Sequence, residues 1–354
     1  MSLHALLMPQ QVKAIEEAPL VADQRHPAWS ALFLHQASAT DFLTRRAADA
    51  VWRSPTFKVD MRSVLQRAAD LENIADAAAA LAELRALGAM IEARMTPVPL
   101  PASAKHGPSP DFEANAGDGP VTVEVHAKHE DGAQTARRFA IAAGEDVPGV
   151  ERTSRKVGDM LVTHTTSVWH PGGTPDPTKP FDSIQANVIS KLCSVKASEH
   201  QRREAVPSVL WLDLTTFDPM SKSQLLQTLP LVSGHIGLTS GAIWHAFYGW
   251  KGAPLLEEGN PRRTTMGHDG RFRMSGDAKS HLAAAIVSFE RGLVLLENPW
   301  ATVPLPAMFR RRCERLPWFK LGNSVADWTR GQAAAQLALA VAQIEALAGQ
   351  AAIR

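Results

Sequence analysis

The stretch VTVEVHAK at residues 121–128 decides the fold, because valine alternates there with polar and charged side chains. Successive side chains of a β-strand point to opposite faces, so the three valines are expected on one face and Glu124, His126 and Lys128 on the other. This period of two predicts a strand with one apolar face that packs into a core. Its other face carries an acid, an imidazole and an ammonium group.

Two neighbouring segments place this strand in a larger sheet. The run SVLWLDLT at 208–215 is mostly apolar, which is typical of a central strand covered on both faces. Before it, residues 184–195 carry apolar side chains at helical spacing, and Asp182 or Ser183 is a suitable N-cap. Further strands are expected at 157–169, 241–250, 283–292 and 293–299, with a hairpin turn at Arg291-Gly292.

The chain divides into three regions by pattern. Helices are predicted at 28–52 and 61–92, and the proline-rich stretch 96–110 predicts a linker because proline removes a backbone donor and fixes φ. An alanine-rich helix with Ser324 as its N-cap is expected from 325 to about 348. We therefore predict an N-terminal helical region packed on the core at 1–95, an α/β core at 96–323 and a C-terminal helix at 324–354.

Composition excludes several classes of protein. The 354 residues are 45% hydrophobic and 21% charged, as in a globular protein with an ample core. Lys and Arg number 37 against 36 Asp and Glu, so the net charge of +1 provides no global attraction to polyanions. The two cysteines are too few for a disulfide framework, the first residues lack the features of a signal peptide, and no apolar stretch reaches the ~20 residues that cross a bilayer. We expect a cytoplasmic protein with no membrane partner.

A pair of acidic residues carries the chemistry that the sequence suggests. Pro110-Asp111-Phe112 is followed by Glu124-Val125-His126-Ala127-Lys128, and the combination resembles the signature of the restriction-endonuclease-like, or PD-(D/E)XK, nuclease superfamily. In that signature Pro-Asp precedes, after a variable spacer, an acidic residue, one further residue and a lysine on a core strand. Asp111 and Glu124 match the two acids. His126 stands where lysine is expected, and Lys128 lies two residues later on the same face.

The resemblance implies a fold as well as a site. It implies a restriction-endonuclease-like mixed sheet flanked by helices, here in an α/β protein with an N-terminal helical extension. In the superfamily the signature strand is followed by more sheet, a packed helix and a further buried strand, and residues 184–201 and 208–215 reproduce that order. Members often present a Gln or Lys from this helix toward metal and phosphate, for which the candidates are Gln185, Lys191 and Lys196. A carboxylate on a preceding helix is also recurrent, and the candidates are Glu72 and Glu83.

The expected roles follow from the demands of phosphodiester hydrolysis. An attacking water must become more acidic and the growing negative charge must be neutralised, and a hard cation held by carboxylates does both. We expect Asp111 and Glu124 to bind Mg²⁺ or Mn²⁺, with Lys128 as the preferred cation beside the scissile phosphate. His126 is the alternative, as a proton acceptor or a ligand. The predicted function is metal-dependent cleavage of nucleic acid, DNA first and RNA second.

Other interpretations stay open. A half-solvated sheet commonly exposes Glu, His and Lys, and Pro-Asp is a common turn. A histidine is mostly neutral at pH 7, so a catalytically silent nuclease fold that serves as a nucleic-acid or protein scaffold is the alternative function. The alanine-rich terminal helix permits close packing and hence a homodimer.

The remaining candidate sites are weaker. A separate hydrolytic site is conceivable at Asp213, His235, His245 and His268, although core histidines explain them better. Local basic clusters of a kind that can neutralise phosphates lie at 137–138, 152–156, 262–263, 271–273 and 310–312. The sequence has no P-loop, no G-x-G-x-x-G after a strand and no G-x-S-x-G elbow, which argues against an ATPase, a dinucleotide enzyme or an α/β-hydrolase.

Overall fold

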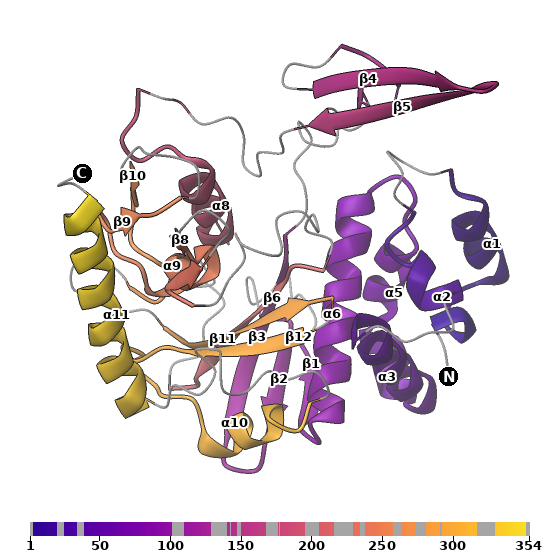
Figure 1. Cartoon of the computed structure of the whole chain (residues 1–354). Coiled ribbons are helices and arrows are strands. Elements are labelled where there is room, and N and C mark those ends of the chain that lie inside the picture. Colours follow the sequence, from indigo (N-terminus) through magenta and orange to yellow (C-terminus); the bar gives the residue numbers. More distant parts are fainter. Residues whose placement is uncertain are drawn as a thin grey trace.

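A six-stranded mixed sheet forms the centre of the protein, seen in a computed structural model. The structure describes residues 3–19, 25–33, 39–100, 110–128, 140–141, 143–146, 150–167, 176, 178–194, 205–215, 229–233, 238–257, 264–273, 281–290, 292–316 and 330–351. One hydrophobic core joins helices from both ends of the described chain to the sheet, from Leu3 to Ile344. The structure is thus a mixed α/β fold whose sheet is flanked by helices (Figure 1).

The sheet has the order β1-β2-β3-β6-β11-β12. Its strands are β1 (Thr96–Pro99), β2 (Phe112–Asn115), β3 (Pro120–Ala127), β6 (Ser208–Asp213), β11 (Leu282–Phe289) and β12 (Gly292–Glu297). β6 pairs in parallel with β3 on one side and with β11 on the other, whereas the remaining pairs are antiparallel. The predicted strands at 121–128 and 208–215 are therefore confirmed, and the second is the central, doubly covered strand that its apolar run indicates.

The linker predicted at 96–110 is partly wrong, because its first residues form the edge strand β1. Residues 96–99 pair with β2 although two of them, Pro97 and Pro99, are prolines. An edge strand tolerates proline because one side of its backbone has no neighbour that needs a donor. Residues 101–109 lie outside the described part of the chain.

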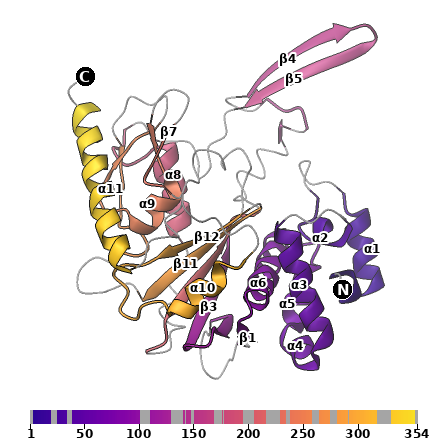
Figure 2. The same cartoon turned by 60° about the horizontal axis from the view of Figure 1, so that its bottom comes forward.

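N-terminal helices pack against one side of the sheet (Figures 1 and 2). They are η1 (Leu3–Ala5), α1 (Pro9–Glu17), α2 (Trp29–Phe33), α3 (Ala39–Arg53), α4 (Pro55–Asp60), α5 (Arg62–Ala68) and α6 (Ile74–Glu92). The single helix expected at 61–92 is wrong, because it breaks between α5 and α6. There Asp70 accepts hydrogen bonds from the backbone N–H groups of Glu72 and Asn73, and Asn73 caps α6 by accepting one from Asp76.

The other side of the sheet is covered by α8 (Ile184–Cys193), α9 (Ala242–Tyr248) and α11 (Arg330–Ala351), and α10 (Ala307–Cys313) lies near one end (Figure 1). Short strand pairs accompany them: β7 (Leu231–Ser233) with β8 (Leu238–Ser240), and β9 (Pro254–Leu255) with β10 (Thr264–Thr265). The helix predicted from the apolar spacing after residue 184 is confirmed as α8. Ser183 is the N-cap of α8, because the Ser183 hydroxyl accepts a hydrogen bond from the backbone N–H of Ala186.

The strand predicted at 241–250 is wrong, since α9 is a helix. All seven of its residues are buried, so its apolar side chains face inward on every side. A short segment that is apolar all round shows no period, and sequence alone does not separate a strand from a helix there. The hairpin of β11 and β12 is confirmed, although Arg291 of its turn lies outside the described residues, as does Ser324 before α11.

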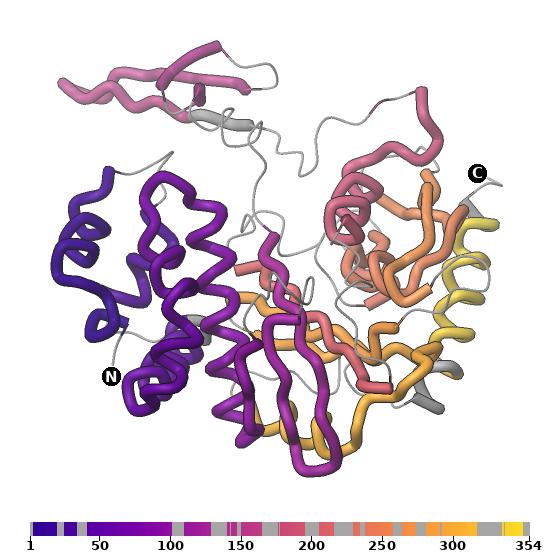
Figure 3. Tube along the Cα trace, turned by 180° about the vertical axis from the view of Figure 1, so that it is seen from behind, coloured from indigo at the N-terminus to yellow at the C-terminus, as the bar shows by residue number. Residues whose placement is uncertain are grey.

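A long hairpin of β4 (Val150–Val157) and β5 (Met160–Ser167) projects from the rest of the protein (Figures 1 and 3). The extended segment expected from 157 is confirmed for β5, which pairs with β4 and stands apart from the six-stranded sheet. Its Gly158 has φ +63° in the turn, a conformation that favours glycine. Exposed apolar side chains gather near the turn, at Val157, Met160, Leu161 and Val162.

Replacing Gly88 by alanine tests the packing of α3 on α6. A Cβ at position 88 would collide with the backbone carbonyl of Leu43, which is part of α3 and has no rotamer through which to yield. We expect Gly88→Ala to lower the free energy of unfolding by about 1–3 kcal/mol, measured by urea denaturation. The control Gly349→Ala in α11 meets open space and should raise stability by up to about 1 kcal/mol through helix propensity. Equal effects of the two substitutions would contradict the close contact.

Candidate functional site

The two predicted acids lie on neighbouring strands. The antiparallel register pairs Phe112 of β2 with Val123 of β3, so Asp111, one residue before β2, comes level with Glu124. The Asp111 carboxylate accepts a hydrogen bond of 2.7 Å from the backbone N–H of Val125. Glu124 is buried on β3. The fold therefore brings together the two residues that the sequence pattern separates by a loop.

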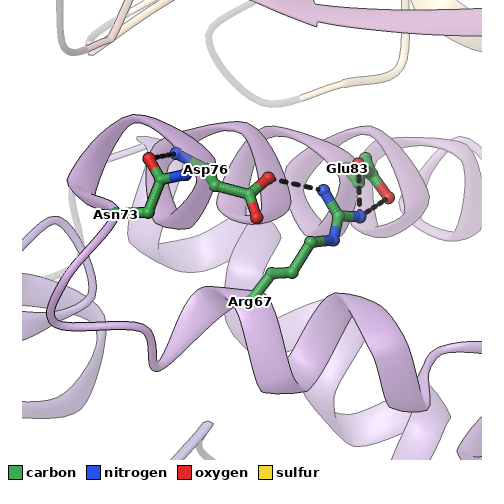
Figure 4. Close-up of polar contacts among 4 residues, drawn as sticks. All are labelled: Arg67, Asn73, Asp76 and Glu83. Carbon is green, nitrogen blue, oxygen red and sulfur yellow. Dashed lines mark hydrogen bonds and ion pairs between the residues drawn. The ribbon is translucent and has the colours of Figure 1, made fainter.

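A third carboxylate comes from α6. Arg67 on α5 donates two hydrogen bonds to Glu83, at 2.8 and 3.0 Å, and a third to Asp76 at 3.1 Å (Figure 4). This fork fixes the Glu83 side chain on the helix that packs against β3. Of the two helix candidates, Glu83 is the one whose charge acts on Asp111, whereas Glu72 is exposed in the turn before α6.

The three carboxylates repel one another in a poorly solvated place. Burial raises the pKa of Asp111 to about 8, and repulsion from Glu83 and then Glu124 adds to the effect. The Val125 N–H and the Arg67 guanidinium act in the opposite direction but do not cancel it. Burial also raises the pKa of Glu83, against the attraction of Arg67. At neutral pH the Asp111 carboxyl therefore holds a proton, which is how a crowded acid site lowers its negative charge.

The donor set suits a hard divalent cation. Carboxylate oxygens are the ligands that Mg²⁺ prefers, and a cation among these groups would replace the proton that burial and their repulsion hold on Asp111. In the described part of the chain, no three His, Cys, Asp or Glu side chains are already gathered as ligands around one point. Asp111 is aimed at the β3 backbone through its hydrogen bond, so its carboxylate would have to turn to take up a metal.

His126 lies beside the second acid. Its Nε2 is 3.3 Å from Oε1 of Glu124 and is buried, without the angles of a hydrogen bond. The position that holds lysine in the resembling signature is thus filled by an imidazole in contact with the strand's own carboxylate. Such a ring is placed to exchange a proton with a group bound at Glu124.

Lys128 points to a different element. Its Nζ donates hydrogen bonds of 3.2 Å to both the carbonyl and the hydroxyl of Ser194, at the C-terminal end of α8. Burial lowers the pKa of Lys128, and the neighbouring Lys191 lowers it further while the Cys193 thiol opposes this. The ammonium group is therefore placed among residues of α8 and serves less directly than expected as a partner of Glu124.

The helix candidates on α8 differ in their surroundings. Gln185 is fully buried, and neither atom of its amide has a hydrogen-bond partner among the described residues. Lys191 lies near Lys128, and Lys196 falls outside the described part of the chain. The sequence pattern identifies Gln185 as a candidate but does not identify Arg67. Arg67 reaches Glu83 only because α5 packs on α6.

The alternative hydrolytic site is not assembled by the described residues. Asp213 is held by Arg85 through hydrogen bonds of 2.8 and 2.9 Å. His245 is a core histidine: burial lowers its pKa to about 4, and its Nδ1 lies 2.9 Å from the carbonyl oxygen of Gly241. His268 lines a pocket beside α8, and His235 lies outside the described residues.

Comparison with known proteins adds no family to this geometry. No family model matches the chain, and neither the curated proteins nor the solved structures give a match. Within the described residues, every helix is too short or too polar to span a bilayer. The nuclease resemblance, the cytoplasmic location and the homodimer stay predictions.

Replacing Asp111 by asparagine tests the electrostatics of the three acids. The unfolded chain loses this proton near pH ~3.9, whereas the folded protein keeps it to about pH 8, so the folded state binds more protons between these values. The free energy of unfolding contributed by Asp111 is therefore lost as pH rises through this window. Asp111→Asn is neutral throughout, so its stability relative to the unsubstituted protein should rise between about pH 5 and pH 8 by more than ~1.4 kcal/mol, the equivalent of one pKa unit.

Chemical denaturation across this pH range measures the difference. The matched control is Asp159→Asn, in the exposed turn of the β4–β5 hairpin, whose relative stability should not change with pH. A flat profile for Asp111→Asn as well would show that Asp111 is ionised in the folded protein at neutral pH.

Proposed function

We propose that the protein is a metal-dependent nuclease that hydrolyses phosphodiester bonds in DNA, with RNA as the second substrate. The observation that carries this proposal is the register that sets Asp111 level with Glu124, together with the charge of Glu83, which acts on Asp111 from α6. Burial, with the repulsion of Glu83 and Glu124 added to it, raises the pKa of Asp111 enough to keep a proton there, and a divalent cation relieves that repulsion. A hard cation held by carboxylates would supply what phosphodiester hydrolysis needs, namely a more acidic water and neutralised phosphate charge.

The order of the elements supports the same proposal. Along the chain, α6 precedes the antiparallel strands β1, β2 and β3, and α8 then leads to β6, which pairs with β3 in parallel. The signature strand, a later helix and a further buried strand are the arrangement that the PD-(D/E)XK resemblance implies. We therefore interpret the sheet as restriction-endonuclease-like.

Each side chain has a defined part in this proposal. Asp111 and Glu124 hold the cation, with Glu83 as a third acid that Arg67 positions through its two hydrogen bonds. Mg²⁺ or Mn²⁺, when bound, acidifies a water and neutralises charge on the phosphate. His126 accepts the proton of the attacking water, because its imidazole Nε2 lies 3.3 Å from the Glu124 carboxylate.

The second candidate function is a silent nuclease fold that binds nucleic acid or protein without cleaving. Two observations favour it: the expected lysine is His126, and the Lys128 ammonium is engaged by Ser194. Both reduce the fixed positive charge beside the acids.

Cleavage assays on plasmid, single-stranded DNA and RNA with Mg²⁺ or Mn²⁺ test the proposal. We expect Glu124→Gln and Asp111→Asn to lower cleavage at least about 100-fold, since even outer partners of a metal ligand contribute about 10–100-fold. Glu83→Gln should lower it as well, whereas the control Glu72→Gln, an exposed acid before the same helix, should leave it unchanged.

The outcome separates the two candidate functions. Cleavage by the unsubstituted protein that Asp111→Asn abolishes eliminates the scaffold. A protein that does not cleave, but gains cleavage when His126→Lys restores the expected cation, is the silent form. Cleavage that survives Glu124→Gln would place the chemistry elsewhere.

A further inference from the structure

A pocket of about 340 Å³ lies on the exposed side of α8, between the C-terminal part of this helix and residues 268–273. Its polar lining residues are Ser190, Ser194, His268, Asp269, Arg271 and Arg273. None of the three acids of the candidate site lines it, so it is a separate feature of the surface.

Positive charge gathers around this pocket from three segments of the chain. Arg271 and Arg273 line it directly. Lys128, which follows β3, bonds to Ser194 of the lining, and Lys191 on α8 is close enough to Lys128 to shift its pKa. Two arginines thus line the pocket, Lys128 is attached to the lining residue Ser194, and Lys191 acts on Lys128.

The acids of the pocket do not balance these cations. Asp269 is the acid of the described lining; it attracts Arg273 and accepts a hydrogen bond of 2.7 Å from the backbone N–H of Lys251. Two arginines of the described lining, Arg271 and Arg273, therefore share one lining carboxylate. Burial lowers the pKa of both Lys128 and Arg273, so these charges are held where water solvates them poorly. An anion in the pocket would offset that cost.

Neutral partners hold two of these cations in place. The Arg273 Nε donates to the carbonyl of Tyr248 at 2.9 Å, and its guanidinium lies 4.5 Å from the centroid of the Trp300 ring. Lys128 is bonded to a carbonyl and a hydroxyl. These partners carry no charge, so among the groups named here Asp269 alone offsets the charge of Arg273. Cationic donors held in this way suit a phosphate, because charge-assisted hydrogen bonds are strong.

We propose that this pocket binds a backbone phosphate of the polynucleotide substrate. The inference rests on the proposed function and extends it, because it gives the substrate a second point of attachment. Lys128 lies four residues after Glu124, one residue beyond the end of β3, which is about 13 Å at ~3.3 Å per residue of extended chain. The pocket therefore gives the strand a second anchor, separate from the phosphate held at the acids.

Binding of a fluorescent single-stranded oligonucleotide in EDTA tests the inference, because no cleavage occurs there. We expect the double variant Lys191→Gln/Arg271→Gln to bind at least about tenfold more weakly, with the slope of log K against log salt reduced by about 0.7 for each lost phosphate contact. The matched control Lys13→Gln/Arg62→Gln removes the same charge from exposed positions on α1 and α5 and should bind as the unsubstituted protein does. Arg271→Lys keeps the charge and should keep the salt slope.

The outcomes distinguish this inference from the proposed function. Unchanged binding and salt slope in the folded double variant overturn the pocket, whether or not the protein cleaves. Binding that depends on the pocket in a protein without cleavage keeps the pocket and rejects the nuclease. Inorganic phosphate or a mononucleotide that competes as well as the oligonucleotide, at equal phosphate concentration, overturns the polynucleotide as the ligand. If circular dichroism shows that the double variant is unfolded, the single variant Lys191→Gln replaces it, with oligonucleotide affinity and salt slope as the two measurements.

Discussion

The arrangement of the site depends on the buried ion pair between Arg85 and Asp213. Arg85 lies two residues after Glu83 on α6, and Asp213 ends the central strand β6, so the pair fixes the helix along the sheet. The side chains are only 7% and 1% exposed, and Asp213 also accepts bonds from the N–H and hydroxyl of Thr215. Leaving one charge of such a pair alone costs about 3–5 kcal/mol, so the helix has little freedom to slide. The position of Glu83 relative to Asp111 follows from this constraint.

Three acidic side chains lie in a poorly solvated part of the fold, and their mutual repulsion lowers the stability of the folded protein. The sheet and α6 hold the Glu83, Asp111 and Glu124 carboxylates in place, although among the described residues the Arg67 guanidinium is the one cation that acts on both Glu83 and Asp111. Without a cation, a proton reduces their repulsion. The site therefore exists in a form that favours the arrival of positive charge, and the same forces that raise the pKa of Asp111 would strengthen the binding of a metal ion.

Sequence patterns predicted the parts of this structure that depend on local order. The alternation around Val123 defined β3, the apolar run defined β6, and helical spacing with Ser183 as the cap defined α8. The choice between Glu72 and Glu83 was beyond the sequence, because it depends on where α6 meets the sheet. The part played by Arg67 depends likewise on the packing of α5 against α6, and α9 was misassigned because burial on all sides removes its periodicity. Local pattern thus predicted elements, and tertiary packing selected the residues that meet.

The β4–β5 hairpin, between β3 and α8 in the sequence, has a consequence for how such a protein changes over evolutionary time. Its strands pair with each other alone, and Arg152 ties its base to the carbonyl of Ile141 at 2.9 Å. An isolated two-stranded ribbon contributes little stability of its own, so its length and its exposed tip are free to vary without disturbing the sheet. Changes in the length of this ribbon would therefore alter the reach of the molecule and leave α6, β2 and β3, which position the acids, unchanged.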